Sequence, residues 1–250
     1  IPQQRKILRA QGLAGKTPAP FTSGFAHLHA VTGQGSAMSE GQAAALLLWV
    51  LLLIFSLRGT LLRTLYHNPL YQHLCLGGAI VLVPLWTLRA GLHEGLDVHF
   101  LGLTSLTLLL GWRLALLAPC LTLLVLSYFG VIPLAEIGWQ ALIGVALPVA
   151  TTWLLFLASW AWLPRHLFVY LFVVAFLGGA LSISIKVVAS ALLMGLSNTY
   201  PWYTISADYL SIWPLLLFPE ALLNGMTMTL LAIYRPHWVN TFFDREYLGR

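Results

Sequence analysis

Two histidines and an aspartate lie close together between apolar stretches and are the side chains best suited to bind a metal: His93, Asp97 and His99. Imidazole and carboxylate groups are common ligands of divalent transition metals. No charge follows His99 before Arg113, so we expect His99 at the mouth of an apolar helix, near water and packed among other helices. The pattern predicts either a metal site centred on His99 or an interfacial histidine that hydrogen-bonds a loop carbonyl.

Two further charges lie inside long apolar segments. Lys186 is about 12 residues from Asn198 and Glu220 is about 13 residues from Ala207, which are the outer ends of their segments. At about 1.5 Å per residue, both lie about 18–20 Å deep in a membrane. An unpaired charge at that depth costs at least about 2.5–3.5 kcal/mol. We therefore expect a buried charge pair, or one neutral partner, that either locks two helices together or belongs to a conduction or gating path.

The composition indicates that the helices around these residues lie in a lipid bilayer. Hydrophobic residues make up 59% of the chain and charged residues 8%, whereas a soluble domain carries about 25% charge. Four of the thirteen basic residues fall within residues 1–37, and the rest nearly balance the eight acidic residues, so the net charge of +5 is no signal for nucleic acid. Residues 1–37 are polar and rich in Gly and Pro, which predicts a disordered leader, extension or tag. Residues 38–250 are predicted to form a single integral membrane domain.

The apolar segments predict an all-α, polytopic membrane bundle of about seven transmembrane helices. A hydrocarbon core about 30 Å thick requires about 20 residues per helix, and the third segment is short for that length. We expect the third segment to be a helix that begins below the membrane surface, with His99 near its mouth. The predicted spans are 43–65, 73–90, 97–111, 114–134, 139–163, 167–197 and 207–234.

The basic residues predict the orientation of the bundle. With seven spans and the N-terminus outside, Arg89 is the basic residue of the outer loops, and seven arginines lie on the cytoplasmic side. That asymmetry follows the positive-inside rule, so we predict N-terminus out and C-terminus in, with His93 and His99 on the outer side. The seven inner arginines are Arg58, Arg63, Arg113, Arg165, Arg235, Arg245 and Arg250.

Familiar catalytic motifs are missing from the sequence. It contains no GxxxxGK[ST] phosphate loop, no HExxH and no GxSxG, which are the signatures of nucleotide hydrolysis, metalloprotease and serine hydrolase chemistry. We therefore expect that the protein is not an enzyme and that a partner supplies any ATP hydrolysis.

Three sequence stretches together resemble the CbiM-type permeases, the substrate-capture subunits of energy-coupling factor (ECF) ABC transporters for cobalt and nickel. The stretches are HFLGLTSLTLLLGWRLALLA at 99–118, FPEALLNGM at 218–226, and RPHWVNTFFDREYL at 235–248. The similarity covers about residues 40–250 and is closest to a proteobacterial branch of uncharacterised members. It implies a CbiM-like, multi-pass permease of the bacterial inner membrane, with an ECF transmembrane coupling subunit, ATPase subunits and the lipid bilayer as partners.

The resemblance also implies the substrate. Cobalt or nickel would be captured as the transported ion, with no permanently bound cofactor, and His99 falls on the family's metal-binding histidine. Metal-binding members begin Met-His-Ile, and that terminus completes their site, whereas Met38 here is followed by Ser-Glu. His93, Glu94 and Asp97 are therefore the further ligand candidates.

Two alternatives stay open at this point. One is a membrane accessory or binding protein of CbiM-like fold without metal transport, in which the Lys186–Glu220 pair is structural. The other is an integral membrane enzyme, which would need a second catalytic group near His99 or Glu220. Convergence of His93, Asp97 and His99 within about 5 Å of one point would favour the metal site, because coordination bonds are about 2.0–2.2 Å long.

Overall fold

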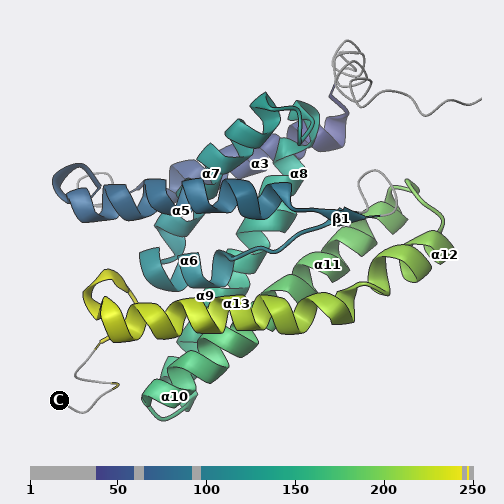
Figure 1. Cartoon of the computed structure of the whole chain (residues 1–250). Coiled ribbons are helices and arrows are strands. Elements are labelled where there is room, and N and C mark those ends of the chain that lie inside the picture. Colours follow the sequence, from purple (N-terminus) through teal and green to yellow (C-terminus); the bar gives the residue numbers. More distant parts are fainter. Residues whose placement is uncertain (1–37, 59–64, 92–96, 244–246, 248–250) are drawn as a thin grey trace, which may run out of the picture. The chain divides into compact units, whose positions relative to one another are not determined.

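The computed structural model describes residues 38–58, 65–91, 97–243 and 247, and shows a bundle of helices (Figure 1). The predicted all-α fold is confirmed, and the predicted leader at 1–37 lies outside the described residues. Within those residues, four helical segments are long and apolar enough to cross a membrane: α5 (Pro69–Thr87), Leu134–Trp162, Leu167–Leu196 and α13 (Trp213–Tyr234). Two shorter apolar helices, α3 (Glu40–Ser56) and α7 (Trp112–Tyr128), join them.

The two longest segments are built from several helical pieces. Leu134–Trp162 runs from a 3-10 turn (Leu134–Glu136) through α8 (Ile137–Ala141) and a π-helical turn (Leu142–Ala146) into α9 (Leu147–Trp162). Leu167–Leu196 passes from α10 (Leu167–Val169) through a π-helical stretch (Tyr170–Leu177) into α11 (Gly178–Leu196). Ahead of α13 lie α12 (Trp202–Thr204) and a third π-helical stretch (Ile205–Leu210), and a 3-10 turn (Pro236–Trp238) follows it.

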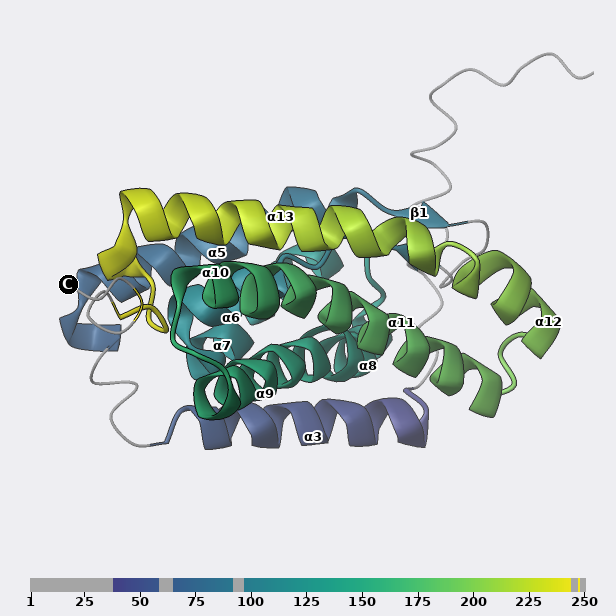
Figure 2. The ribbon, with the colours of Figure 1, turned by 90° about the horizontal axis from the view of Figure 1, so that it is seen from below.

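The third predicted span is a half-helix, α6 (Leu103–Leu110). Its eight residues extend only about 12 Å, so α6 cannot cross a hydrocarbon core of about 30 Å by itself. Seven of the eight are buried, and α6 packs against α7, α9 and α13 inside the bundle (Figures 1 and 2). The predicted span 97–111 is thus too long. The structure instead contains a short helix that begins inside the bundle.

Backbone geometry explains why α6 is short. Gly102 before the helix has φ +63°, and Gly111 after it has φ +78°. Side chains other than glycine are strained at such positive φ values, so these two glycines permit the sharp changes of direction. The antiparallel pair of two-residue strands β1 (Ala90–Gly91) and β2 (Asp97–Val98) leads into the first of these turns.

The last turn of α6 is satisfied by the C-terminal segment of the chain, which folds back onto it. The backbone N–H groups of Asn240 and Thr241 donate to the carbonyls of Leu109 and Leu108 at 2.9 and 3.3 Å. The Thr241 hydroxyl also donates to the Leu108 carbonyl at 2.8 Å and shares a 2.7 Å hydrogen bond with the Tyr170 hydroxyl. The carbonyls that a helix leaves unpaired at its C-terminus thereby gain partners from 133 residues away in the sequence.

Replacing Thr241 with valine is expected to destabilise the bundle by about 1–3 kcal/mol. Valine has a similar shape but leaves the buried Tyr170 hydroxyl without this partner, and an unsatisfied buried group costs about that much. Thermal unfolding of the detergent-solubilised protein measures the effect. Ser206→Ala is the matched control, because Ser206 is exposed and bonds only to a carbonyl three residues away. Equal unfolding temperatures for the two variants would contradict the role assigned to Thr241.

Candidate functional site

His99 lies in the turn between β2 and α6 and is 6% exposed. Its Nδ1 is 3.1 Å from the carbonyl oxygen of Phe100. Because a carbonyl can only accept, this contact requires a proton on Nδ1, and in a neutral ring the lone pair then lies on Nε2. The loop-carbonyl contact expected for a structural histidine is therefore present, and it is also the arrangement by which proteins orient a metal-binding imidazole.

Trp86 of α5 supports the same turn, and the sequence analysis did not identify it. Its ring centroid lies 5.4 Å from that of His99, with the planes inclined by 48°. Its indole N–H donates to the carbonyl of Leu101 at 3.1 Å. A tryptophan within an apolar helix gives no signal of such a role, because most of these residues only pack.

The N-terminus of α6 is held by Glu220 of α13. One carboxylate oxygen accepts the backbone N–H of Leu101 at 2.9 Å, and the other accepts that of Gly102 at 2.8 Å. A helix N-terminus has unpaired N–H groups and a partial positive charge, so a carboxylate is stabilised there. Glu220 is fully buried, and it therefore serves as a helix cap supplied from a distant segment.

Asn224, one helical turn after Glu220, completes this cap. Its side-chain oxygen accepts from both the backbone N–H and the hydroxyl of Ser105, each at 2.8 Å. Its amide donates to Glu220 Oε1 at 2.8 Å. The sequence analysis missed Asn224, although a polar residue four positions after a buried glutamate lies on the same face of the helix and could have indicated it.

Lys186 of α11 is 5% exposed, so both charges expected inside the bundle are buried. Lys186 and Glu220 lie on helices α11 and α13, which pack against each other. Among the described residues no hydrogen bond joins the two side chains, since the carboxylate is bonded to the turn before α6 and to Asn224. Direct pairing of Lys186 and Glu220 stays a prediction.

Three hydroxyl groups form a second polar cluster, one turn from Lys186. Thr104, Thr152 and Ser182 lie 2.9 to 3.2 Å from one another and are almost fully buried. They come from α6, α9 and α11, so the cluster ties the half-helix to two long helices. Together with Glu220 and Asn224, this cluster provides hydrogen-bond partners for the polar groups in the first turn of α6.

The other predicted ligands are not placed. His93 lies outside the described residues, and of Asp97 the structure describes only the backbone, as part of β2. Within the portion of the chain that is described, no three or more His, Cys, Asp or Glu residues form a group suited to hold a metal. The structure thus places His99 at the mouth of α6, and the complete ligand set stays a prediction.

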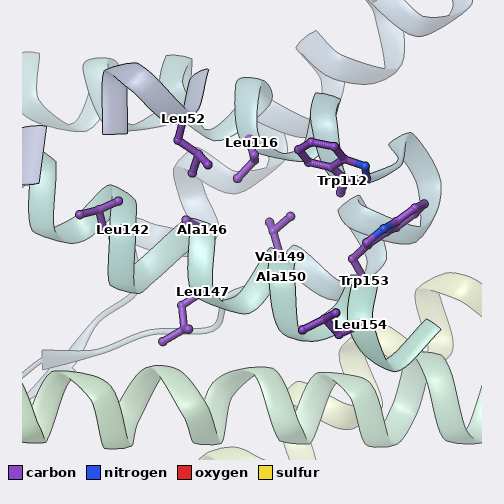
Figure 3. Close-up of a pocket in the computed structure, with 10 residues that line it drawn as sticks. All are labelled: Leu52, Trp112, Leu116, Leu142, Ala146, Leu147, Val149, Ala150, Trp153 and Leu154. Carbon is purple, nitrogen blue, oxygen red and sulfur yellow. The ribbon is translucent and has the colours of Figure 1, made fainter. Parts of the chain in front are cut away.

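A groove of about 450 Å³ lies elsewhere, between α3, α7 and the segment that contains α9 (Figure 3). Two tryptophans, Trp112 and Trp153, lie at the same end of the groove in this view. Its remaining lining consists of aliphatic side chains, namely Leu52, Leu116, Leu142, Ala146, Leu147, Val149, Ala150 and Leu154. Without imidazole or carboxylate groups, this groove is suited to apolar contact and is separate from His99.

Four helical segments long and apolar enough to cross a membrane indicate a multi-pass membrane protein. Broken helices and intramembrane charges, both found here, are features of many transporters. The family described as the cobalt uptake substrate-specific transmembrane region, CbiM, matches residues 38–238, and the chain belongs to that family. It is a family of transporters rather than of enzymes. Comparison with curated proteins and with solved structures finds no match.

Proposed function

We propose that this protein is the capture subunit of an ECF-type importer that takes a cobalt or nickel ion from the outer side of the bacterial inner membrane. The observation that carries the proposal is the orientation of His99, whose Nδ1 is engaged by a backbone carbonyl at the mouth of α6. Membership of the cobalt uptake family supports the choice of ion. Neutral imidazole is a suitable ligand for such metals.

His93 and Asp97 are proposed to complete the site with His99. One imidazole does not make a tight site, because transition metals usually take three or four protein donors unless water fills the remaining positions. Both residues precede His99 by no more than six positions, so they are close to it along the chain. Glu220 is assigned to the support of α6 rather than to metal coordination.

The partners proposed are an ECF transmembrane coupling subunit and its ATPase subunits. The sequence has no phosphate-binding loop, so ATP-driven uptake requires ATP hydrolysis by another chain. The predicted orientation, with the N-terminus out and the C-terminus in, presents the capture site outside and leaves the arginine-rich loops for the cytoplasmic partners.

A CbiM-like accessory protein without metal transport is the second candidate function. The buried side chain of Lys186 favours it, because a fixed positive charge inside the bundle opposes the entry of a divalent cation. The measurement that separates the two candidates is metal binding by the purified protein.

His99→Ala is expected to abolish Co²⁺ binding or weaken it by well over tenfold. The loss of a second-shell partner alone costs about 10–100-fold, and His99 is proposed as a direct ligand. Isothermal titration of the detergent-solubilised full chain with Co²⁺, and separately with Ni²⁺, gives affinity and stoichiometry. His73→Ala is the matched control, because His73 is an exposed histidine of α5. Absence of binding by the wild type, or equal binding by the two variants, would rule out the proposed site.

A further inference from the structure

Leu101, in the turn that carries His99, has both of its backbone polar groups bonded to side chains of other helices. Glu220 accepts the N–H of Leu101 at 2.9 Å, and Trp86 donates to its carbonyl at 3.1 Å. Glu220 also accepts the next N–H, that of Gly102. Two residues after His99, the backbone is therefore tied to α13 on one side and to α5 on the other.

The cap on α6 is not local, which distinguishes it from an ordinary helix cap. In most helices the side chain of the N-cap residue accepts the first free N–H groups. Here the N-cap is Gly102, which has no side chain, and no side-chain cap comes from that position. The acceptor comes instead from Glu220, 118 positions away, so the position of the turn depends on the position of α13.

Asn224 fixes the Glu220 carboxylate in the orientation that this cap needs. Its amide donates to Glu220 Oε1, while its oxygen accepts from Ser105 in the first turn of α6. Both Glu220 and Asn224 are fully buried. Hydrogen bonds to a buried carboxylate are short and strong because no water competes for them.

Helix α11 has a glycine, Gly179, where it packs against Glu220 and Asn224. A Cβ at Gly179 of α11 would lie 3.0 Å from Asn224 Nδ2 and 3.0 Å from the Glu220 carbonyl oxygen. Any larger residue here would press on Asn224 and on the backbone of α13, so a glycine favours the close approach of α11 to this part of α13. The arrangement is built from α6, α11 and α13 together.

We propose that Glu220 and Asn224 are positioning residues of the capture site, which hold the His99 turn in the one conformation that presents the imidazole to the metal. This inference rests on the proposed function, since it requires His99 to be a ligand. Neither residue touches the metal. Their effect is transmitted through the backbone of residues 101–105 and appears in the affinity and the coordination geometry of the bound ion.

The test compares Co²⁺ binding by Glu220→Gln with binding by the wild type, in the detergent-solubilised full chain. Glutamine has the same size but can accept only one of the two N–H groups with its single oxygen. We expect affinity to fall by about tenfold, in the range typical of groups that orient metal ligands. We also expect the visible absorption spectrum of bound Co²⁺ to change, because the imidazole is no longer held in the same direction.

Thr122→Val is the matched control. Thr122 is fully buried, and its hydroxyl donates to the Ala79 carbonyl at 3.0 Å, so its loss also removes a buried hydrogen bond but leaves the His99 turn untouched. Thr122→Val is expected to lower the unfolding temperature while the Co²⁺ affinity and spectrum stay those of the wild type. Gly179→Ala, which retains every polar group but displaces Asn224, provides a second perturbation and is expected to weaken binding severalfold.

The outcomes distinguish a failure of the positioning role of Glu220 and Asn224 from a failure of the proposed metal capture. Wild-type affinity and spectrum in both Glu220→Gln and Gly179→Ala, with binding still lost in His99→Ala, would overturn the positioning role alone. A loss of affinity in Thr122→Val as large as that in Glu220→Gln would also overturn it, because general destabilisation would then explain both. No Co²⁺ binding by the wild type would overturn the proposed function and the positioning role together.

Discussion

Replacing Gly138 with alanine is expected to force α3 and α8 apart and to destabilise the bundle by about 3 kcal/mol or more, at the upper end of the cost of overpacking. A Cβ at this position would lie 2.5 Å from the backbone nitrogen of Leu46 and 2.9 Å from the carbonyl carbon of Ala45. These are backbone atoms of α3, which cannot rotate away as a side chain can. Small residues commonly allow such close approach of membrane helices. Thermal unfolding and the monodisperse yield in detergent measure the loss.

Gly77→Ala is the control for this prediction. Gly77 lies in α5, and a Cβ there would have no neighbour within 4 Å. Because glycine in a helix costs about 0.5–1 kcal/mol relative to alanine, this variant should be as stable as the wild type or slightly more stable. Similar losses in Gly138→Ala and Gly77→Ala would show that the contact between α3 and α8 does not limit stability.

The long apolar segments were predictable from sequence because hydrophobicity and flanking polar residues define them. The expected span 167–197 corresponds closely to the helical segment Leu167–Leu196, which begins just after Pro164, Arg165 and His166. The limits of α6 were not predictable in the same way. They depend on the positive φ angles of Gly102 and Gly111, and a glycine in a sequence shows only that such an angle is allowed.

In the candidate site, too, some features were predictable from the sequence and others were not. Counting residues along a helix predicted that Lys186 and Glu220 would be buried, since depth depends only on the rise per residue. The hydrogen-bond partners of Glu220 could not be predicted in this way, because Leu101 and Gly102 are more than a hundred positions away in the sequence. HFLG at 99–102 and FPEALLNG at 218–225 were recognised as separate stretches, and the structure shows that they are in direct contact. The C-terminal stretch at 235–248 likewise meets the other end of α6 through Asn240 and Thr241.

Glu220→Leu is expected to be the most damaging single substitution in the interior, with a loss of about 3–5 kcal/mol. It removes the acceptor for the N–H groups of Leu101 and Gly102 and the partner of the Asn224 amide, and each buried polar group left unsatisfied costs about 1–3 kcal/mol. Lys186→Met should cost less, because the Glu220 carboxylate keeps its three hydrogen bonds. Urea or thermal unfolding of the purified protein gives both values.

The double variant Glu220→Leu, Lys186→Met then tests whether the two charges are coupled. If Lys186 compensates Glu220, removing both charges should cost less than the two single losses combined, by about 0.5–3 kcal/mol, the range found for interacting residues. The N–H groups at the start of α6 stay unpaired in both Glu220→Leu variants, so their cost cancels in the comparison. Losses that add to within about 0.5 kcal/mol would show that the two charges are independent. Lys186 would then have a role other than charge compensation, such as a place on the substrate path.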